Sequence, residues 1–239
     1  MNQFNVYDIF GYLLPGALVV IVSLVAFSQY VSISLQPTLG ESAILVVVCY
    51  IVGHFVRASV ADRIKGLKPS AEILAPDDRT FPDEIKTRII ESLAGVFSVS
   101  QTSHPDLAKE QQYYFDLAYA LIVQKNAAGY TPIYNSLYAL YRGLLAASGL
   151  SSMIVIGSLF VLLRSANLTP ERLVLHLVSF GILAYLTWGL PFIVPSPLRK
   201  QFDRYARLFA ASVYRNFLVW YQTCEAADDA RTSKGSSSL

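Results

Sequence analysis

Residues 9–30 read IFGYLLPGALVVIVSLVAFSQY and contain no charged side chain. A helix needs about 20 mostly apolar residues to cross about 30 Å of hydrocarbon, because each residue adds about 1.5 Å. Three further stretches have the same character, namely residues 42–60, 143–163 and 173–194. Among them only Arg57, near the end of the second stretch, is charged. The pattern predicts four transmembrane helices arranged as two hairpins.

The composition agrees with this prediction. Apolar residues make up 54% of the chain and charged residues 15%, whereas an average soluble protein has about 25% charged residues. We therefore expect an all-α, polytopic membrane protein with four transmembrane helices and a helical cytoplasmic domain. The expected segments are a first transmembrane hairpin (1–60), a helical cytoplasmic domain (61–142), a second hairpin (143–195), a cytoplasmic amphipathic helix (196–224) and a disordered tail (225–239).

The positions of Lys and Arg predict the orientation. Ten of these residues lie between Arg57 and Arg142, and seven lie in residues 195–239. The loop of residues 31–40 has none, and the loop after the third stretch has only Arg164 and Arg172. Because positive residues gather on the cytoplasmic side, we expect an inner-membrane protein with both termini and the middle segment in the cytoplasm.

The entry into the first stretch combines a proline and a glycine. Asp8 is placed to cap a helix start with its carboxylate, while Pro15 removes one backbone donor and Gly16 weakens the helix beside it. Two arrangements fit this pattern: a short interfacial turn that breaks at Pro15, or one kinked span. Pro15 and Gly16 are therefore candidates for a hinge or for the entrance of a pore, beside the simpler interpretation of an anchored helix start.

The second stretch contains an ionisable residue, His54, next to a glycine. Ionisable groups are costly in lipid and usually face a protein interior, a cavity or a partner. Gly53 lets another helix approach at the same level. His54 is expected either to make an interhelical hydrogen bond or to line a pore and respond to pH. Arg57 is expected to extend toward the cytoplasmic boundary.

Small residues mark one face of the third stretch. Gly143, Ala147 and Ser151 follow one another at steps of four, a spacing that lets helix backbones pack closely in lipid. The face is a candidate for interhelical packing, either within one chain or between two copies. No span contains an Asp or Glu at depth, which argues against an ion-coupled transporter.

The middle segment is expected to form three helices. Apolar residues at helical spacing predict helices over 83–97 and 105–125, and a third helix opens at Thr131-Pro132 and continues into the third stretch. Tyr134, Tyr138 and Tyr141 lie on one face of that third helix, next to Arg142. This face is expected to pack in a core or to bind a soluble cytoplasmic partner.

The tail is expected to form an amphipathic helix over 197–221. It packs either on an anionic membrane surface or, as we favour, against the helices of the middle segment. Cys49 and Cys224 suggest no disulfide framework and no metal site. The sequence has no recognisable nucleotide-binding, hydrolase or zinc motif. We expect no enzymatic activity, no cofactor, no metal and no nucleic-acid partner.

Three stretches together resemble a loose group of uncharacterised prokaryotic inner-membrane proteins. They are YDIFGYLLPG (7–16), YTPIYNSLYALYRG (130–143) and FDRYARLFAASVYR (202–215). Some members of that group are similar to membrane components of bacterial anti-phage systems, which damage or sense the inner membrane. The resemblance therefore implies an antiviral defence role, and it brings no catalytic residue to this chain.

These observations lead to one functional expectation and two alternatives. We expect a homo-oligomeric membrane component that forms a pore or perturbs the bilayer and is gated from the cytoplasmic side, with Pro15, Gly16, Gly53 and His54 at the moving part. The first alternative is a scaffold that anchors or regulates a soluble partner. The second is a small transporter.

Overall fold

The computed structural model describes residues 6–28, 38–61, 72–75, 77–97, 107–164, 169–189 and 196–236. Within these ranges all regular secondary structure is helical, as the sequence predicts. In chain order the elements are α1 (Val6–Asp8), the π-helix η1 (Ile9–Leu13), α2 (Leu14–Ala26), α3 (Leu39–Ala61), α5 (Asp83–Phe97), α6 (Leu107–Gln124), α7 (Thr131–Arg164), α8 (Pro170–Trp188) and α9 (Pro197–Ser236).

The chain divides into two compact units. We call Met1–Gly66 with Asn135–Tyr205 the span unit, and Leu67–Tyr134 with Ala206–Leu239 the head unit. Helices α7 and α9 each contribute residues to both units. The five segments expected from the sequence have other boundaries and stay a prediction.

Three helices are long and apolar enough to cross a membrane, and their spans are Ile9–Ala26, Leu39–Ser59 and Thr131–Arg164. They overlap the first three predicted stretches, although the third helix begins earlier than predicted and residues 29–30 of the first stretch lie outside the described residues. The fourth predicted stretch corresponds to α8, which is not among the three. Its apolar part begins at Leu173 and the helix ends at Trp188, before Gly189 at a φ of 74°. This described part is about 24 Å long. Residues 190–194 of the predicted stretch lie outside the described residues, so a fourth span stays a prediction.

The first span is one helical rod with a wide turn rather than a separate interfacial turn. Leu14 N–H donates to the Ile9 carbonyl, five residues back, and α2 then begins with Pro15 in its first turn. A proline cannot donate to the carbonyl four residues earlier, and the π-helix lies at this place. The predicted cap by Asp8 is wrong: Asp8 has helical φ and ψ, and its side chain makes no capping hydrogen bond.

The head unit has a continuous apolar core formed by α5, α6 and α9. The sequence-predicted face of α5 supplies Ile89 and Leu93, and α9 supplies Val213, Tyr214 and Phe217, all fully or almost fully buried. The middle part of α9 thus packs against the helices of the middle segment, which is the alternative that we favoured from the sequence.

Helix α9 continues much further than the sequence suggested. A disordered tail was expected from Glu225, but the helix ends only at Ser236, so that prediction is wrong over the described part of the tail. Glu, Ala, Arg and Lys are good helix formers. A helix that is already nucleated also adds residues at little cost.

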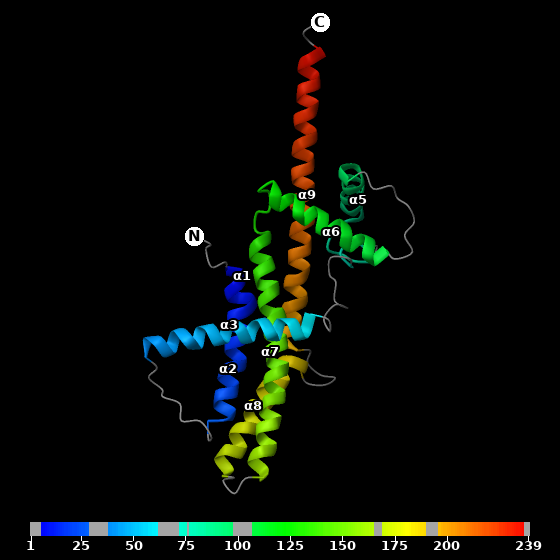
Figure 1. The fold of residues 1–239 in the computed structure, drawn as a ribbon. Coiled ribbons are helices and arrows are strands. Elements are labelled where there is room, and N and C mark those ends of the chain that lie inside the picture. The colour runs from blue at the N-terminus through cyan, green and yellow to red at the C-terminus, as the bar shows by residue number, and fades with distance from the viewer. Residues whose placement is uncertain are drawn as a thin grey trace. The chain divides into compact units, whose positions relative to one another are not determined.

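Within the span unit, α3 runs across η1 and α2 (Figure 1). The two rods touch where Tyr12 and Gly16 of the first meet Cys49 and Gly53 of α3. We call this place the crossing. The N-terminal part of α3 is exposed, with Ile44 at 66% and Val47 at 56%.

Candidate functional site at the helix crossing

Two glycines let the backbones touch at the crossing. A Cβ atom built on Gly16 would lie 1.8 Å from the Cys49 carbonyl oxygen, and one on Gly53 would lie 1.9 Å from the Tyr12 carbonyl oxygen. Any side chain at either position would therefore push the helices apart. The sequence singled out both residues, and the structure brings them together on the two sides of one contact.

Helix α7 adds a third backbone to the same place. A Cβ atom on Gly143 would lie 2.4 Å from Cγ of Pro15, so α7 is closely packed against the proline that precedes Gly16. One turn further along α7, Ala147 is fully buried with Val19 of α2 and Val56 of α3. The small-residue face of α7 thus packs within the chain at these two positions.

Ser151 continues this face, and its environment is unusual. The residue is fully buried, and its hydroxyl has no hydrogen-bond partner among the described residues. One turn earlier, Ser148 receives a hydrogen bond from Thr187 of α8 at 2.8 Å. The same helix therefore packs against α8 through hydroxyl groups as well as against α2 through small residues.

Aromatic rings surround the crossing. The ring of Tyr12 stacks on the ring of His54, with 3.9 Å between the ring centres and 15° between the planes. Tyr50 meets the same histidine edge-on at 4.6 Å. Ring pairs of this geometry add roughly 0.5–1.5 kcal/mol beyond the area that they bury. The rings therefore hold η1 against α3 beside the glycine contact.

The arginine of α3 packs against two tyrosine rings at the crossing, and its extension toward the cytoplasmic boundary stays a prediction. Its guanidinium carbon lies 5.0 Å from the ring centre of Tyr7 and 4.7 Å from that of Tyr12, and Arg57 donates a hydrogen bond to the Tyr7 hydroxyl. Its Nη1 is buried, lies near Gly11, and has no hydrogen-bond partner among the described residues. Cation–π contacts thus replace water around part of this charge, while one of its donors remains without an acceptor.

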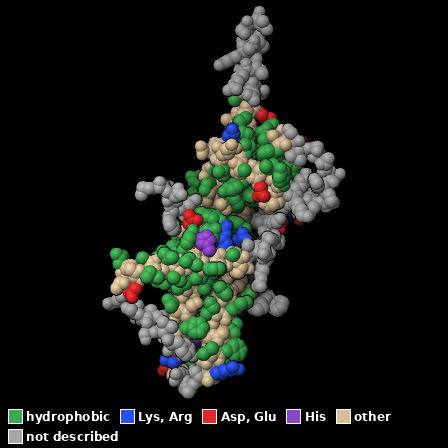
Figure 2. Space-filling model, viewed as in Figure 1, with side chains coloured by type: hydrophobic (Ala, Val, Ile, Leu, Met, Phe, Trp, Pro, Cys, Tyr) green, Lys and Arg blue, Asp and Glu red, His purple; other side chains and the backbone are tan. Residues whose placement is uncertain are grey.

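His54 lies at the surface of the span unit rather than inside it. Its ring makes aromatic contacts and takes part in none of the hydrogen bonds found between described residues. Figure 2 shows Lys and Arg side chains gathered near the middle of an otherwise largely apolar face. Of the two interpretations made from the sequence, the interhelical hydrogen bond is therefore absent here, and the pore-lining role stays a prediction.

The tyrosine face of α7 is largely used within the chain. The ring of Tyr138 lies 5.2 Å from that of Phe202, and Tyr141 stacks on Tyr205 at 5.2 Å with 6° between the planes. Arg142, next to Tyr141 on this helix, is half-buried. Tyr134, which belongs to the head unit, is half-buried. The face thus docks the start of α9 onto α7.

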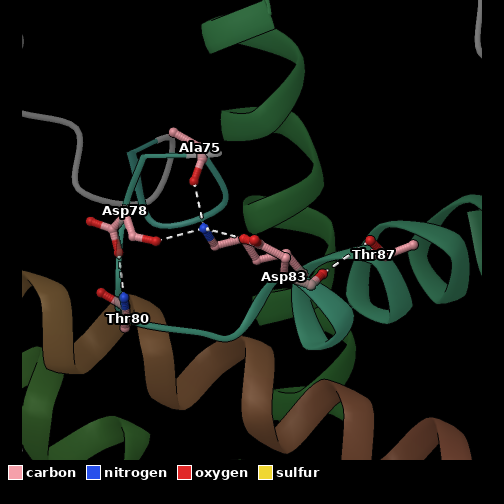
Figure 3. Close-up of polar contacts among 6 residues, drawn as sticks. Ala75, Asp78, Thr80, Asp83 and Thr87 are labelled. Atoms are coloured by element: carbon pink, nitrogen blue, oxygen red, sulfur yellow. Dashed lines mark hydrogen bonds and ion pairs between the residues drawn. The ribbon is translucent and has the colours of Figure 1, made fainter.

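In the head unit, a buried lysine side chain hydrogen-bonds to the segment that precedes α5 (Figure 3). Nζ of Lys86 donates hydrogen bonds to the carbonyl oxygens of Ala75 at 2.8 Å and Asp78 at 2.5 Å, and it lies 3.3 Å from Oδ1 of Asp83. The residue is only 5% exposed. Its partners satisfy the charge that burial would otherwise penalise.

Asp78 connects the same turn to α9. Its carboxylate accepts a hydrogen bond from Thr80 N–H at 2.7 Å and one from Arg207 at 3.1 Å. Burial alone would raise the pKa of Asp78, but the hydrogen bonds from Thr80 and the charges of Arg207 and Lys86 outweigh it, and the pKa lies below its ordinary value. Nothing in the sequence pattern set these residues apart from ordinary surface charges.

Sequence reasoning identified the glycines but missed the tyrosine–arginine contacts. A signal existed: Tyr50, His54 and Arg57 follow at steps of four and three, which places them on one face of α3. The contacts of Tyr7 and Tyr12 with that face, by contrast, depend on the tertiary structure and do not follow from residue spacing. Within the described residues no group of three or more His, Cys, Asp or Glu could hold a metal ion.

Comparisons with known proteins give no guide to the chemistry of this site. The chain matches no protein-family model, no curated protein and no solved structure.

Proposed function

We propose that the protein is a homo-oligomeric component of the inner membrane that opens a pore, or perturbs the bilayer, when its cytoplasmic part is triggered. In this proposal α8 serves as a fourth span beside the three candidate spans, which keeps both termini in the cytoplasm. Three sequence stretches resemble a loose group of prokaryotic inner-membrane proteins, some of which are similar to membrane components of anti-phage systems, and this suggests defence as the setting.

The crossing is the observation that carries the proposal. Gly16 and Gly53 place two backbones in direct contact, with a third helix against Pro15. Backbone contacts of this kind leave no room for water or ions. We therefore assign the described arrangement to the closed state, and opening would require the first span and α3 to separate at this point.

Arg57 would favour a second arrangement of the crossing, in which the two helices are separated. In the closed state its charge is held by the rings of Tyr7 and Tyr12, and its buried Nη1 finds no acceptor in the part of the chain that the structure describes. An unpaired buried donor costs roughly 1–3 kcal/mol. Separation of the helices would let water or lipid phosphate accept a hydrogen bond from this nitrogen. That hydrogen bond would offset part of the free energy needed to open the pore.

The trigger would reach the crossing through the chain itself. Helices α7 and α9 belong to both units, and α7 contacts Pro15 through Gly143. A ligand or partner that changes the packing of these helices in the head unit would therefore act on helices that also belong to the span unit. This coupling supports gating from the cytoplasmic side.

Topology provides the first test. An enzyme reporter that is active only in the cytoplasm, fused after Leu239, should be active, and a reporter that works only in the periplasm should be silent. Three spans instead of four would place the C-terminus on the side opposite to the N-terminus. A periplasmic C-terminus would therefore remove α8 from the set of spans.

Membrane depolarisation provides the functional test. Bacterial cells expressing the wild type, Arg57→Leu or the control Arg199→Leu would be loaded with a voltage-sensitive dye. Arg199 is exposed in the first turn of α9 and is not one of the residues that form the crossing. We expect Arg57→Leu to need higher expression than the other two proteins before it depolarises cells, because it removes the buried donor that favours separation of the helices. If all three are present in the membrane fraction and none depolarises the cells, the pore proposal is wrong.

A further inference from the structure

The first two turns of α9 dock onto α7 through an aromatic contact and leave a basic side exposed. The ring of Phe202 lies 5.2 Å from that of Tyr138 of α7. Lys200 and Arg204 come two residues before and two residues after Phe202, a step that places both on the opposite side of the helix. Both side chains are exposed. The span unit therefore presents a lysine and an arginine together on one outward side.

The two cations on this side are neighbours without a matching acid. Lys200 and Arg204 are four residues apart, and like charges at this spacing destabilise a helix. Asp203 comes four residues after Arg199, so those two opposite charges are neighbours and offset each other. Within residues 197–205 this leaves the charges of Lys200 and Arg204 uncompensated. An anion with several acceptor oxygens, such as a phosphate group, would relieve their repulsion by accepting hydrogen bonds from both.

The contacts of α7 place this basic side near the ends of two candidate spans. A Cβ atom built on Gly11 would lie 3.5 Å from Cβ of Ala139 and 3.4 Å from Nη1 of Arg57. Gly11 is close to the start of the span Ile9–Ala26, and Arg57 is close to the end of the span Leu39–Ser59. Ala139 directly follows Tyr138, on which Phe202 packs. Lys200 and Arg204 thus lie where both spans reach their polar ends, which is the depth of lipid headgroups.

We propose that Lys200 and Arg204 together bind the phosphate group of an anionic phospholipid. A zwitterionic lipid carries its own ammonium group and would relieve the repulsion less. Each Lys or Arg beside an anionic membrane surface strengthens binding roughly fivefold. This inference rests on the membrane location that the proposed function assigns, with the start of α9 on the cytoplasmic side, and it does not depend on the pore.

Trp188 provides a reporter beside the start of α9. It ends α8 and is 55% exposed, and Oγ of Ser196, the residue before α9, donates a hydrogen bond to the carbonyl oxygen of Leu186. The other tryptophan of the chain, Trp220, would be replaced by phenylalanine. The full-length protein would be reconstituted in bilayers of equal parts phosphatidylglycerol and phosphatidylcholine, with bromine on the acyl chains of one lipid or of the other. Bromine quenches tryptophan fluorescence, so the two samples show which lipid gathers beside Trp188.

We expect brominated phosphatidylglycerol to quench Trp188 more strongly, with a binding constant at least fivefold that of phosphatidylcholine. Lys200→Gln combined with Arg204→Gln should bring this ratio close to one. The matched control, Arg88→Gln combined with Lys125→Gln, removes two exposed charges from the head unit and should leave the ratio unchanged. Size-exclusion chromatography would show that each protein is folded.

The possible failures differ from one another. Equal quenching by the two lipids in the starting protein, or an unchanged ratio in the folded Lys200→Gln/Arg204→Gln variant, would overturn the lipid site while leaving the proposed pore untouched. Absence of quenching by either lipid would show that Trp188 is not beside the bilayer, and it would overturn the lipid site together with the membrane location on which it rests.

Discussion

Replacing Gly53 by alanine places a methyl group 1.9 Å from the Tyr12 carbonyl oxygen, where ordinary contacts begin at 3.4 Å. The helices would have to separate by about 1.5 Å, the difference between these two distances. Overpacking of this kind costs about 1–3 kcal/mol, whereas alanine gains about 1 kcal/mol of helix propensity over glycine. The cost of the clash should exceed the gain in helix propensity, because a backbone oxygen cannot rotate away as a side chain can.

Cys49 reports on this separation. Its side chain is buried at the crossing, with 6% exposed, whereas Cys224 in α9 is exposed. In purified protein a maleimide should therefore label Cys224 quickly and Cys49 slowly. Gly53→Ala should raise the labelling rate of Cys49 by roughly 5- to 30-fold, the factor that 1–2 kcal/mol of local destabilisation gives. Labelling of Cys224 should not change.

Gly157→Ala is the matched control, because a Cβ atom there meets nothing within 4 Å. It should leave the labelling of Cys49 as in wild type. The elution volume in size-exclusion chromatography would show that each variant is folded. Equal protection of Cys49 in the wild type and in folded Gly53→Ala would refute the close contact at the crossing.

Three further predictions concern the head unit. Lys86→Met should lower its stability by about 1–3 kcal/mol, because two partly buried carbonyl oxygens lose their donor. Lys125→Met at an exposed site should be neutral in the same thermal-unfolding assay. The pKa of Asp78 is lowered in the folded protein, so its contribution to stability is present above the unfolded-state pKa and is lost as the pH falls through the folded-state pKa. The stability of Asp78→Asn, measured by unfolding from pH 7 to 3, should therefore depend less on acid than that of the wild type. Asn216→Ala removes hydrogen bonds to Ala128 and to the Thr131 hydroxyl, at 2.7 and 3.0 Å, and should cost about 1–3 kcal/mol, which chemical denaturation would measure.

Much of the helical framework could be predicted from the sequence because it depends on local periodicity. The start and end of α5 agree with the predicted 83–97, and α7 begins at the predicted Thr131. Both have an apolar face with a regular spacing and a recognisable first turn. The end of α9 was not predicted because its polar sequence lacks an apolar face. A helix that has already formed can continue through such a sequence without one.

The crossing could be predicted only in part. Glycine spacing and Pro15 indicated where backbones approach, because only residues without a large side chain permit it. The position of Arg57 could not be predicted in the same way. An arginine near the end of a span usually extends toward water, and here two tyrosines from another helix provide an alternative environment that depends on the fold.

Ion flux across sealed liposomes that contain the purified protein tests the central claim most directly. Vesicles would be loaded with potassium, and its loss would be followed for the wild type, Gly53→Ala and Gly157→Ala at equal protein density. If the crossing is the closed state of a pore, Gly53→Ala should release potassium faster than the other two proteins. Vesicles that stay as tight as protein-free liposomes with all three proteins would contradict the account.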